Sequence, residues 1–179
     1  MKKEIEKILA DIIRHELDLP ENYGKTPDGN TIPCVSIYGQ NLKLYNVEKI
    51  QITIRTLSAQ AYSNRLEYSV HPEDDEKLIE TQYINQSRMI QVDVFSRNNE
   101  ARQRFWEVSA ALKSTYAQQQ EDLYNFKIGT ITSDNNLSGL EGGSDINRFS
   151  TTFKVIVHYS KSKIIDYYNN FQESISLNN

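Results

Sequence analysis

The hydrophobic period of this chain changes abruptly near its middle, and that change constrains the fold more than any other feature. Over residues 88–95 (RMIQVDVF), Ile90, Val92 and Val94 alternate with polar side chains, which is typical of a strand with one buried face. After a short polar stretch, apolar residues recur every three or four positions, which is typical of an amphipathic helix. They are Ala101, Phe105, Val108, Leu112 and Tyr116, with Trp106 beside them. The sequence therefore predicts a strand that turns directly into a helix reaching about Gln120.

The polar stretch between strand and helix, Ser96 to Asn99, has the composition of a tight turn. Asn98 is the expected N-cap, because its side chain can accept a hydrogen bond from a free N–H group of the first turn. Glu100 lies in that first turn, where the helix dipole favours a negative charge. Both features place the start of the helix close to residue 99.

A second amphipathic helix is predicted over residues 3–18. Its apolar residues fall at steps of three and four. They are Ile5, Ile8, Leu9, Ile12, Ile13 and Leu17. Pro20 ends this helix, and the residues that follow, as far as Pro33, are rich in Gly, Pro, Asn and Asp, so they predict a turn-rich loop.

Alternating segments predict the remaining strands. Residues 49–57 have the clearest alternation, and a further strand is expected to end near Gly39. In residues 65–84, RLEYSV and IETQYIN predict a hairpin around the polar loop HPEDDEK. Residues 126–132 predict a short strand and residues 149–159 a long one.

Together these elements indicate an α+β fold: a mostly antiparallel β-sheet packed by an N-terminal helix and a central helix, with a short C-terminal helix. The last helix is expected in KIIDYYNNF, where Ile164, Ile165, Tyr168 and Phe171 have helical spacing. A length of 179 residues is usual for one domain. We therefore expect residues 1–179 to form a single soluble domain whose end, residues 172–179, is a frayed tail.

Charge and cysteine content exclude some function classes. The net charge of −4 argues against a protein that binds DNA by neutralising phosphates, although it is compatible with a pore through which DNA slides. Cys34 is the only cysteine, so the chain has neither an intramolecular disulfide nor a thiolate zinc cluster, and an intracellular origin is expected. We find no signal-peptide pattern and no apolar segment long enough to span a membrane.

The residues that could carry chemistry do not form a recognisable catalytic or binding pattern. His15, His71 and His158 fall in separate predicted elements without metal-ligand spacing. The acids at 73–76 are consecutive rather than alternating, so they indicate a solvated loop and not a calcium site. No nucleophile elbow or phosphate loop is present. We therefore expect no enzyme activity, no catalytic residue, no metal and no cofactor.

The polar connection over residues 133–148 is too long for a tight hairpin turn, so we expect it to be mobile or held by a partner. Its glycines allow the backbone to mould against a neighbour. The candidate assembly loop consists of Ser138, Gly139, Leu140, Glu141, Gly142, Gly143 and Ser144. A plain flexible loop is the other interpretation of the same residues.

The strand-turn-helix segment QSRMIQVDVFSRNNEARQRFWEVSAALKST resembles the central signature of bacteriophage neck and tail-terminator proteins. In that signature a strand of the form I-x-V-D-V-F/Y leads through a short polar turn into an amphipathic helix. The N-terminal helix, the early strand IQITIRTL and the late strand FSTTFKVIVHY, preceded by Arg148, occur in a similar order. The resemblance covers about residues 3–160, whereas the HPEDDEK insertion and the KIIDYYNNF extension depart from it.

The resemblance implies a ring-forming subunit of the virion, typically a hexamer, that is assembled in the host cytoplasm and located in the neck or tail. Its partners would be copies of itself, the tail-tube protein and a head-completion or connector protein, while DNA only passes through the lumen. Such a ring caps the tail tube and joins it to the head. A ring closes through heterologous contacts, so each copy needs two different complementary patches.

Two alternatives remain open. One stays within phage assembly, as another head–tail joining protein or a tail-tube protein. The other is a monomeric ligand-binding module or small enzyme in which Tyr62, Tyr68 and Tyr83 line a pocket. Tyrosines at strand positions are also common as cross-strand packing residues.

Overall fold

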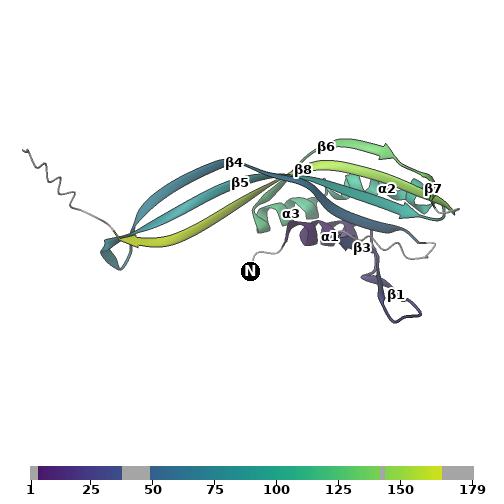
Figure 1. Ribbon diagram of the computed structural model, residues 1–179, viewed down its shortest axis with the longest axis horizontal. Helices are drawn as coiled ribbons and strands as arrows, with labels where there is room; N and C mark the ends of the chain where they lie inside the picture. Colours follow the sequence, from purple (N-terminus) through teal and green to yellow (C-terminus); the bar gives the residue numbers. More distant parts are fainter. Residues whose placement is uncertain (1–3, 38–48, 142–143, 167–179) are drawn as a thin grey trace, which may run out of the picture. The chain divides into compact units, whose positions relative to one another are not determined.

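The computed structural model describes residues 4–37, 49–141 and 144–166, and it has the α+β architecture expected from the sequence (Figure 1). The helices are α1 (Ile5–Glu16), α2 (Glu100–Ala111) and α3 (Thr115–Tyr124). The strands are β1 (Asn22–Lys25), β2 (Thr31–Pro33), β3 (Val35–Ile37), β4 (Gln51–His71), β5 (Asp74–Ser96), β6 (Phe126–Asn136), β7 (Gly139–Glu141) and β8 (Ser144–Asp166).

The main sheet has the strand order β3-β4-β5-β8-β6, and β7 pairs with β8. The β3–β4 pair is parallel, whereas β6 and β7 both run antiparallel to β8. β1 and β2 form a separate antiparallel pair inside the segment expected to be a turn-rich loop. Gly24 and Gly29 supply left-handed backbone there, with φ of 101° and 82°.

The chain divides into two compact units, which we describe separately. Unit 1 comprises residues 1–60 and 86–157, and unit 2 comprises residues 61–85 and 158–179. The single domain expected from the chain length stays a prediction.

Unit 1 holds the hydrophobic core, between one face of its sheet and the three helices (Figure 1). In unit 1, many alternating residues of the predicted strands face inward as expected, and several of them are at most 1% exposed. They include Ile52, Ile54, Ile90, Val92, Val94, Phe153 and Val155. The apolar stripe of α1 is buried, and its Glu6 carboxylate accepts hydrogen bonds from Thr56 of β4 and Arg88 of β5. Thus α1 lies across the even-numbered face of β4 and β5.

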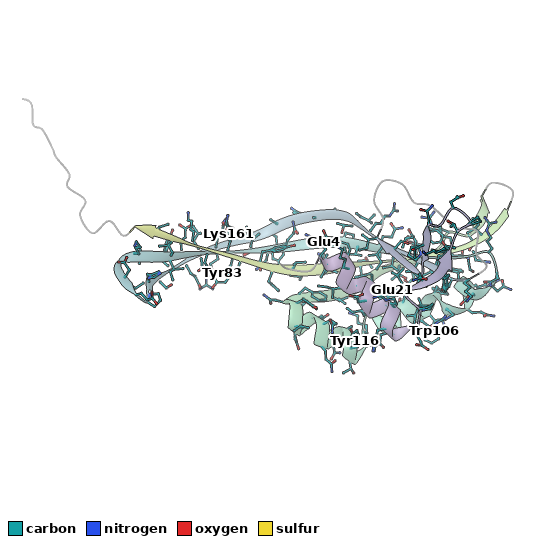
Figure 2. All side chains as sticks on the ribbon, turned by 90° about the horizontal axis from the view of Figure 1, so that it is seen from below. Glu4, Glu21, Tyr83, Trp106, Tyr116 and Lys161 are labelled. Carbon is teal, nitrogen blue, oxygen red and sulfur yellow. The ribbon has the colours of Figure 1, made fainter. Side chains whose placement is uncertain are left out.

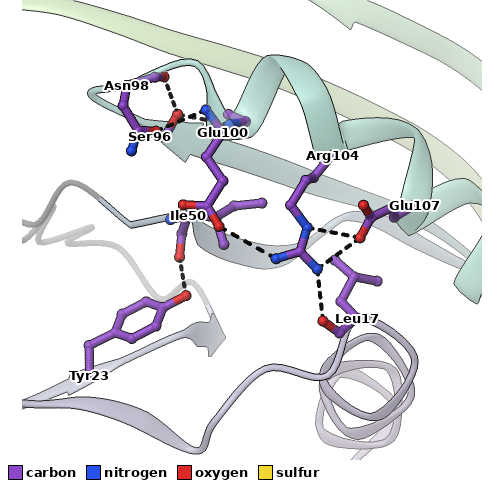
Figure 3. Close-up of polar contacts among 9 residues, drawn as sticks. Leu17, Tyr23, Ile50, Ser96, Asn98, Glu100, Arg104 and Glu107 are labelled. Atoms are coloured by element: carbon purple, nitrogen blue, oxygen red, sulfur yellow. Dashed lines mark hydrogen bonds and ion pairs between the residues drawn. The ribbon is translucent and has the colours of Figure 1, made fainter.

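A polar cluster fixes where α2 begins relative to α1 and β4 (Figure 3). The Glu100 carboxylate accepts a hydrogen bond from the Ile50 N–H at 3.0 Å. Arg104 donates to the Leu17 carbonyl at the end of α1 (2.8 Å) and to Glu107 (2.9 Å). Tyr23 donates to the Ile50 carbonyl at 2.7 Å. The polar groups of this cluster form hydrogen bonds with one another, so we assign the cluster a structural role in holding α2 against α1 and the start of β4.

The long predicted central helix is wrong as a single element, because the structure has two helices, α2 and α3. The backbone leaves the helix at Leu112, and Ser114 is extended. The Ser114 hydroxyl accepts a hydrogen bond from the Ala117 N–H at 3.0 Å, so a serine N-cap starts α3. The N-cap of α2 is Asn99, one residue after the expected position, although the Asn98 side chain accepts a hydrogen bond from the Glu100 N–H at 2.9 Å.

The predicted C-terminal helix is also wrong where the structure describes it, because Ile164 and Ile165 lie in β8. β8 is held beside β5 by the Glu80–Lys163 ion pair (2.8 Å) and by the hydrogen bond between Thr81 and Ser162 (2.9 Å). Two adjacent isoleucines fit a strand as well as a helix, and pairing with β5 selects the strand. The rest of that predicted helix and the predicted frayed tail lie outside the described residues.

The expected hairpin forms, but its strands are far longer than predicted. Residues 51–57 of the predicted strand 49–57 lie in the same strand, β4, as RLEYSV, and IETQYIN and RMIQVDVF belong to β5. Only Pro72 and Glu73 remain in the turn. Neither Gly nor Pro interrupts β4 or β5, so nothing in either sequence ends the strand. The strand expected to end near Gly39 is represented by β3 up to Ile37, and its end lies outside the described residues.

Candidate interaction surface

The three histidines considered as metal ligands have separate surroundings. His15 stacks on Tyr116 with ring centroids 4.0 Å apart, His71 accepts a hydrogen bond from the Glu73 N–H, and His158 lies 2.6 Å from the Asn85 side-chain oxygen. Throughout residues 4–37, 49–141 and 144–166, no three His, Cys, Asp or Glu side chains come close enough to hold a metal ion. The described histidines are thus explained by packing and hydrogen bonding.

The candidate assembly loop is a hairpin rather than an open loop. β7 pairs antiparallel with the start of β8, with Gly139 opposite Ile146 and Glu141 opposite Ser144. Ser138 is exposed, and its hydroxyl accepts a hydrogen bond from the Arg148 N–H at 3.0 Å. The predicted connection over residues 133–148 is therefore too long, because β6 and β8 both extend into it. Gly142 and Gly143 lie outside the described residues, and an assembly contact at Ser138–Ser144 stays a prediction.

The structure brings together two residues of the phage-like pattern that are far apart in the sequence. Arg148 lies 3.3 Å from the carboxylate of Asp93, the acidic residue of the strand signature. Asp93 also accepts a hydrogen bond from Gln91 at 2.7 Å, and Gln91 in turn accepts one from Arg55 at 2.8 Å. This polar row crosses β4, β5 and β8 in unit 1. Sequence reasoning identified both ends of the pair without linking them.

Unit 2 is a three-stranded ribbon made from β4, β5 and β8, and side-chain contacts show which residues share a face. Asn64 bonds to Gln82, and Glu80 pairs with Lys163, so the even positions of β4 and β5 lie on one face with the odd positions of β8. Thr81 bonds to Ser162 on the opposite face. Tyr83 and Lys161 consequently lie on opposite faces of the ribbon (Figure 2).

The even face of β4 in unit 2 carries large apolar side chains that are exposed. They are Tyr62 (55% exposed), Leu66 (48%), Tyr68 (56%) and Val70 (60%), which we call the β4 apolar row. The odd positions between them are polar: Ser63, Arg65, Glu67, Ser69 and His71. On the even face, Leu78 and Ile84 of β5 and Ile165 of β8 are half-buried beside the row. A strand with one apolar face normally buries that face.

The alternation of Leu66, Tyr68 and Val70 is visible in the sequence, and RLEYSV was predicted as a strand. The exposure of its apolar face was not predicted. Asn64 interrupts the apolar series between Tyr62 and Leu66. Tyr62 and Tyr68 belong to the row, whereas Tyr83 lies on the other face. The three tyrosines of the ligand-pocket hypothesis therefore do not converge on one site.

No family model matches the chain, and no curated protein matches it. Among the described helices, none is both long and apolar enough to cross a membrane. The β4 apolar row calls for a functional explanation, because it places four exposed large apolar side chains on one strand face.

Proposed function

We propose that this chain is a ring-forming structural subunit of a tailed bacteriophage, a neck or tail-terminator protein that caps the tail tube and joins it to the head connector. The observation that carries the proposal is the β4 apolar row, because exposed apolar side chains in series mark surfaces that other proteins cover. The chemistry offered by the row is apolar contact, which suits permanent assembly.

The resemblance of the strand-turn-helix segment gives the proposal its phage context. The strand of that segment is the centre of the unit 1 sheet, and its Asp93 is paired with Arg148 across β5 and β8. A paired sheet of this kind can serve as a scaffold for contact elements. The two units then have different roles, with unit 1 as scaffold and unit 2 as contact surface.

Negative-stain imaging of the purified protein mixed with tail tubes of the phage that encodes it tests the proposal. We expect rings at one end of each tube. Long polymers of the protein itself would instead indicate a tail-tube subunit, and bare tube ends together with no oligomer larger than a dimer by mass photometry would overturn the proposal.

A pair of matched variants tests the role of the row. The double substitution Tyr62→Ser and Tyr68→Ser should abolish tube-end rings while leaving the circular dichroism spectrum unchanged, because both side chains are exposed. Tyr83→Ser alters an exposed aromatic residue on the opposite face and should leave the rings intact. Equal loss of rings in both proteins would exclude the row as the contact surface.

A further inference from the structure

Within residues 4–37, 49–141 and 144–166, no strand pairs with the outer edge of β4 in unit 2. β3 pairs with β4 only from Ile52 to Ile54, and among the described residues no other strand lies on that side. Residues 61–71 of β4 thus form an unpaired edge. Such an edge is a template for another strand, because its N–H and C=O groups can pair with a second backbone instead of with water.

The opposite edge of the ribbon, formed by β8, differs in charge. β6 pairs with β8 from Phe149 to Val157, and beyond that point β8 carries Lys161 and Lys163, both exposed. Lysines at an edge oppose strand addition, because two such edges repel each other. The β4 edge instead carries one charge of each sign, Arg65 and Glu67, which form an ion pair at 2.5 Å.

The charges and the apolar row together select one register for pairing with a second copy. In an antiparallel pair centred on Leu66, Arg65 of each copy lies opposite Glu67 of the other, and Leu66 lies opposite itself. On the same face as Leu66, Tyr62 meets Val70. All these pairs are of kinds that stabilise antiparallel strands.

Neighbouring registers are worse for identifiable reasons. Centring the pair on residue 65 puts Arg65 opposite Arg65, and centring it on residue 67 puts Glu67 opposite Glu67. A shift of one strand by a single residue pairs even-numbered with odd-numbered positions. The apolar face of one strand then lies beside the polar face of the other. Only the register centred on Leu66 satisfies both the charges and the faces.

We propose that two copies of this chain associate in solution through the outer edges of β4, antiparallel and centred on Leu66, to form a continuous six-stranded sheet from the two ribbons. The contact is isologous, with each copy supplying the same edge. The inference rests on the edge, the charges and the row. It shares the row with the proposed function but does not require a ring-forming subunit.

Charge exchange tests the register. In sedimentation equilibrium at low salt, Arg65→Glu alone or Glu67→Arg alone should raise the dimer dissociation constant about tenfold, because two attractive cross-strand pairs become repulsive. The double variant Arg65→Glu with Glu67→Arg should restore dimerisation. Lys161→Glu, on the other edge of the ribbon, is the control and should leave the dissociation constant unchanged. A monomeric wild-type protein, or a double variant as weak as the single ones, would overturn the proposal.

Crosslinking provides a second measurement. Residues opposite each other in an antiparallel pair have Cα atoms about 4.5–5.5 Å apart, within disulfide range. Leu66→Cys should therefore give a disulfide-linked dimer on oxidation. Tyr62→Cys should not, because residue 62 of one copy lies opposite Val70 of the other, eight residues away from that copy's own residue 62. The native Cys34 is buried and should not contribute. Equal crosslinking of both variants, or crosslinking of neither, would contradict the register.

Discussion

At the scale of single residues, Asp93 and Arg148 form an ion pair in unit 1 in which the carboxylate is largely shielded from water. The Asp93 side chain is 4% exposed and that of Arg148 is 31% exposed, and the Arg148 guanidinium also lies 5.1 Å from the centre of the Phe95 ring. Removing one partner of such a pair leaves a poorly solvated charge, which costs more than the pair itself contributes.

We therefore expect Asp93→Ala to lower the free energy of unfolding by about 3 kcal/mol, measured by urea denaturation. Asp122→Ala is the matched control, because Asp122 pairs with Lys127 while its side chain is 79% exposed. Its effect should stay within about 0.5 kcal/mol. Similar effects of the two substitutions would show that burial does not strengthen the Asp93 contact.

Cys34 and Tyr23 predict a loss of stability in alkaline solution. Burial raises the pKa of the Cys34 thiol, and burial together with the neighbouring Cys34 raises the pKa of the Tyr23 phenol. Below the ordinary pKa of each group, the folded and unfolded chains are both protonated. As the pH rises through about 8.5 for a thiol and about 10 for a phenol, only the unfolded chain loses its protons, so stability falls.

Urea denaturation at a series of pH values from 7.5 to about 10.5 measures this fall. Cys34→Ala should flatten the part of the profile near the thiol range, whatever its effect on stability at pH 7.5. A wild-type profile with no decline over the series would contradict the assignment of these groups as buried and neutral.

At the scale of elements, the pairing between β6 and β8 is longer than the sequence predicted. Leu137 donates a backbone hydrogen bond to the Arg148 carbonyl at 2.8 Å, so the pairing of β6 with β8 continues past Asn136. The polar, Gly-rich composition of residues 133–148 predicted a long connection, whereas β6, β7 and β8 occupy most of the residues described there. Polar side chains are compatible with a strand when both of its faces are in water.

Deletion of Ser138–Ser144 should leave the core intact, because it removes β7 and the turn while retaining Arg148 for its contact with Asp93. We expect a native circular dichroism spectrum and a loss of stability of about 1–2 kcal/mol from the missing strand pairs. If the segment is also an assembly contact, tube-end rings should disappear. Rings formed normally by the deleted protein would limit the segment to a structural role.

At the scale of the whole molecule, the sequence by itself determined the fold class and most of the core. The alternation of Ile90, Val92 and Val94, and the stripe of α1, each requires one buried face, and a period alone specifies which residues occupy it. The turn at Ser96–Asn99 was equally readable, because capping depends on residues adjacent in the chain.

Only the tertiary structure decided how far each strand extends and which face stays exposed. Local patterns could not show that β8 continues through Ile164 beside β5, since that outcome depends on pairing between residues about 80 positions apart. Nor could they show that Tyr62 and Leu66 stay exposed although they alternate as Ile52 and Ile54 do. Alternation indicates that a face is apolar, whereas the presence of a covering element depends on how distant parts of the chain pack.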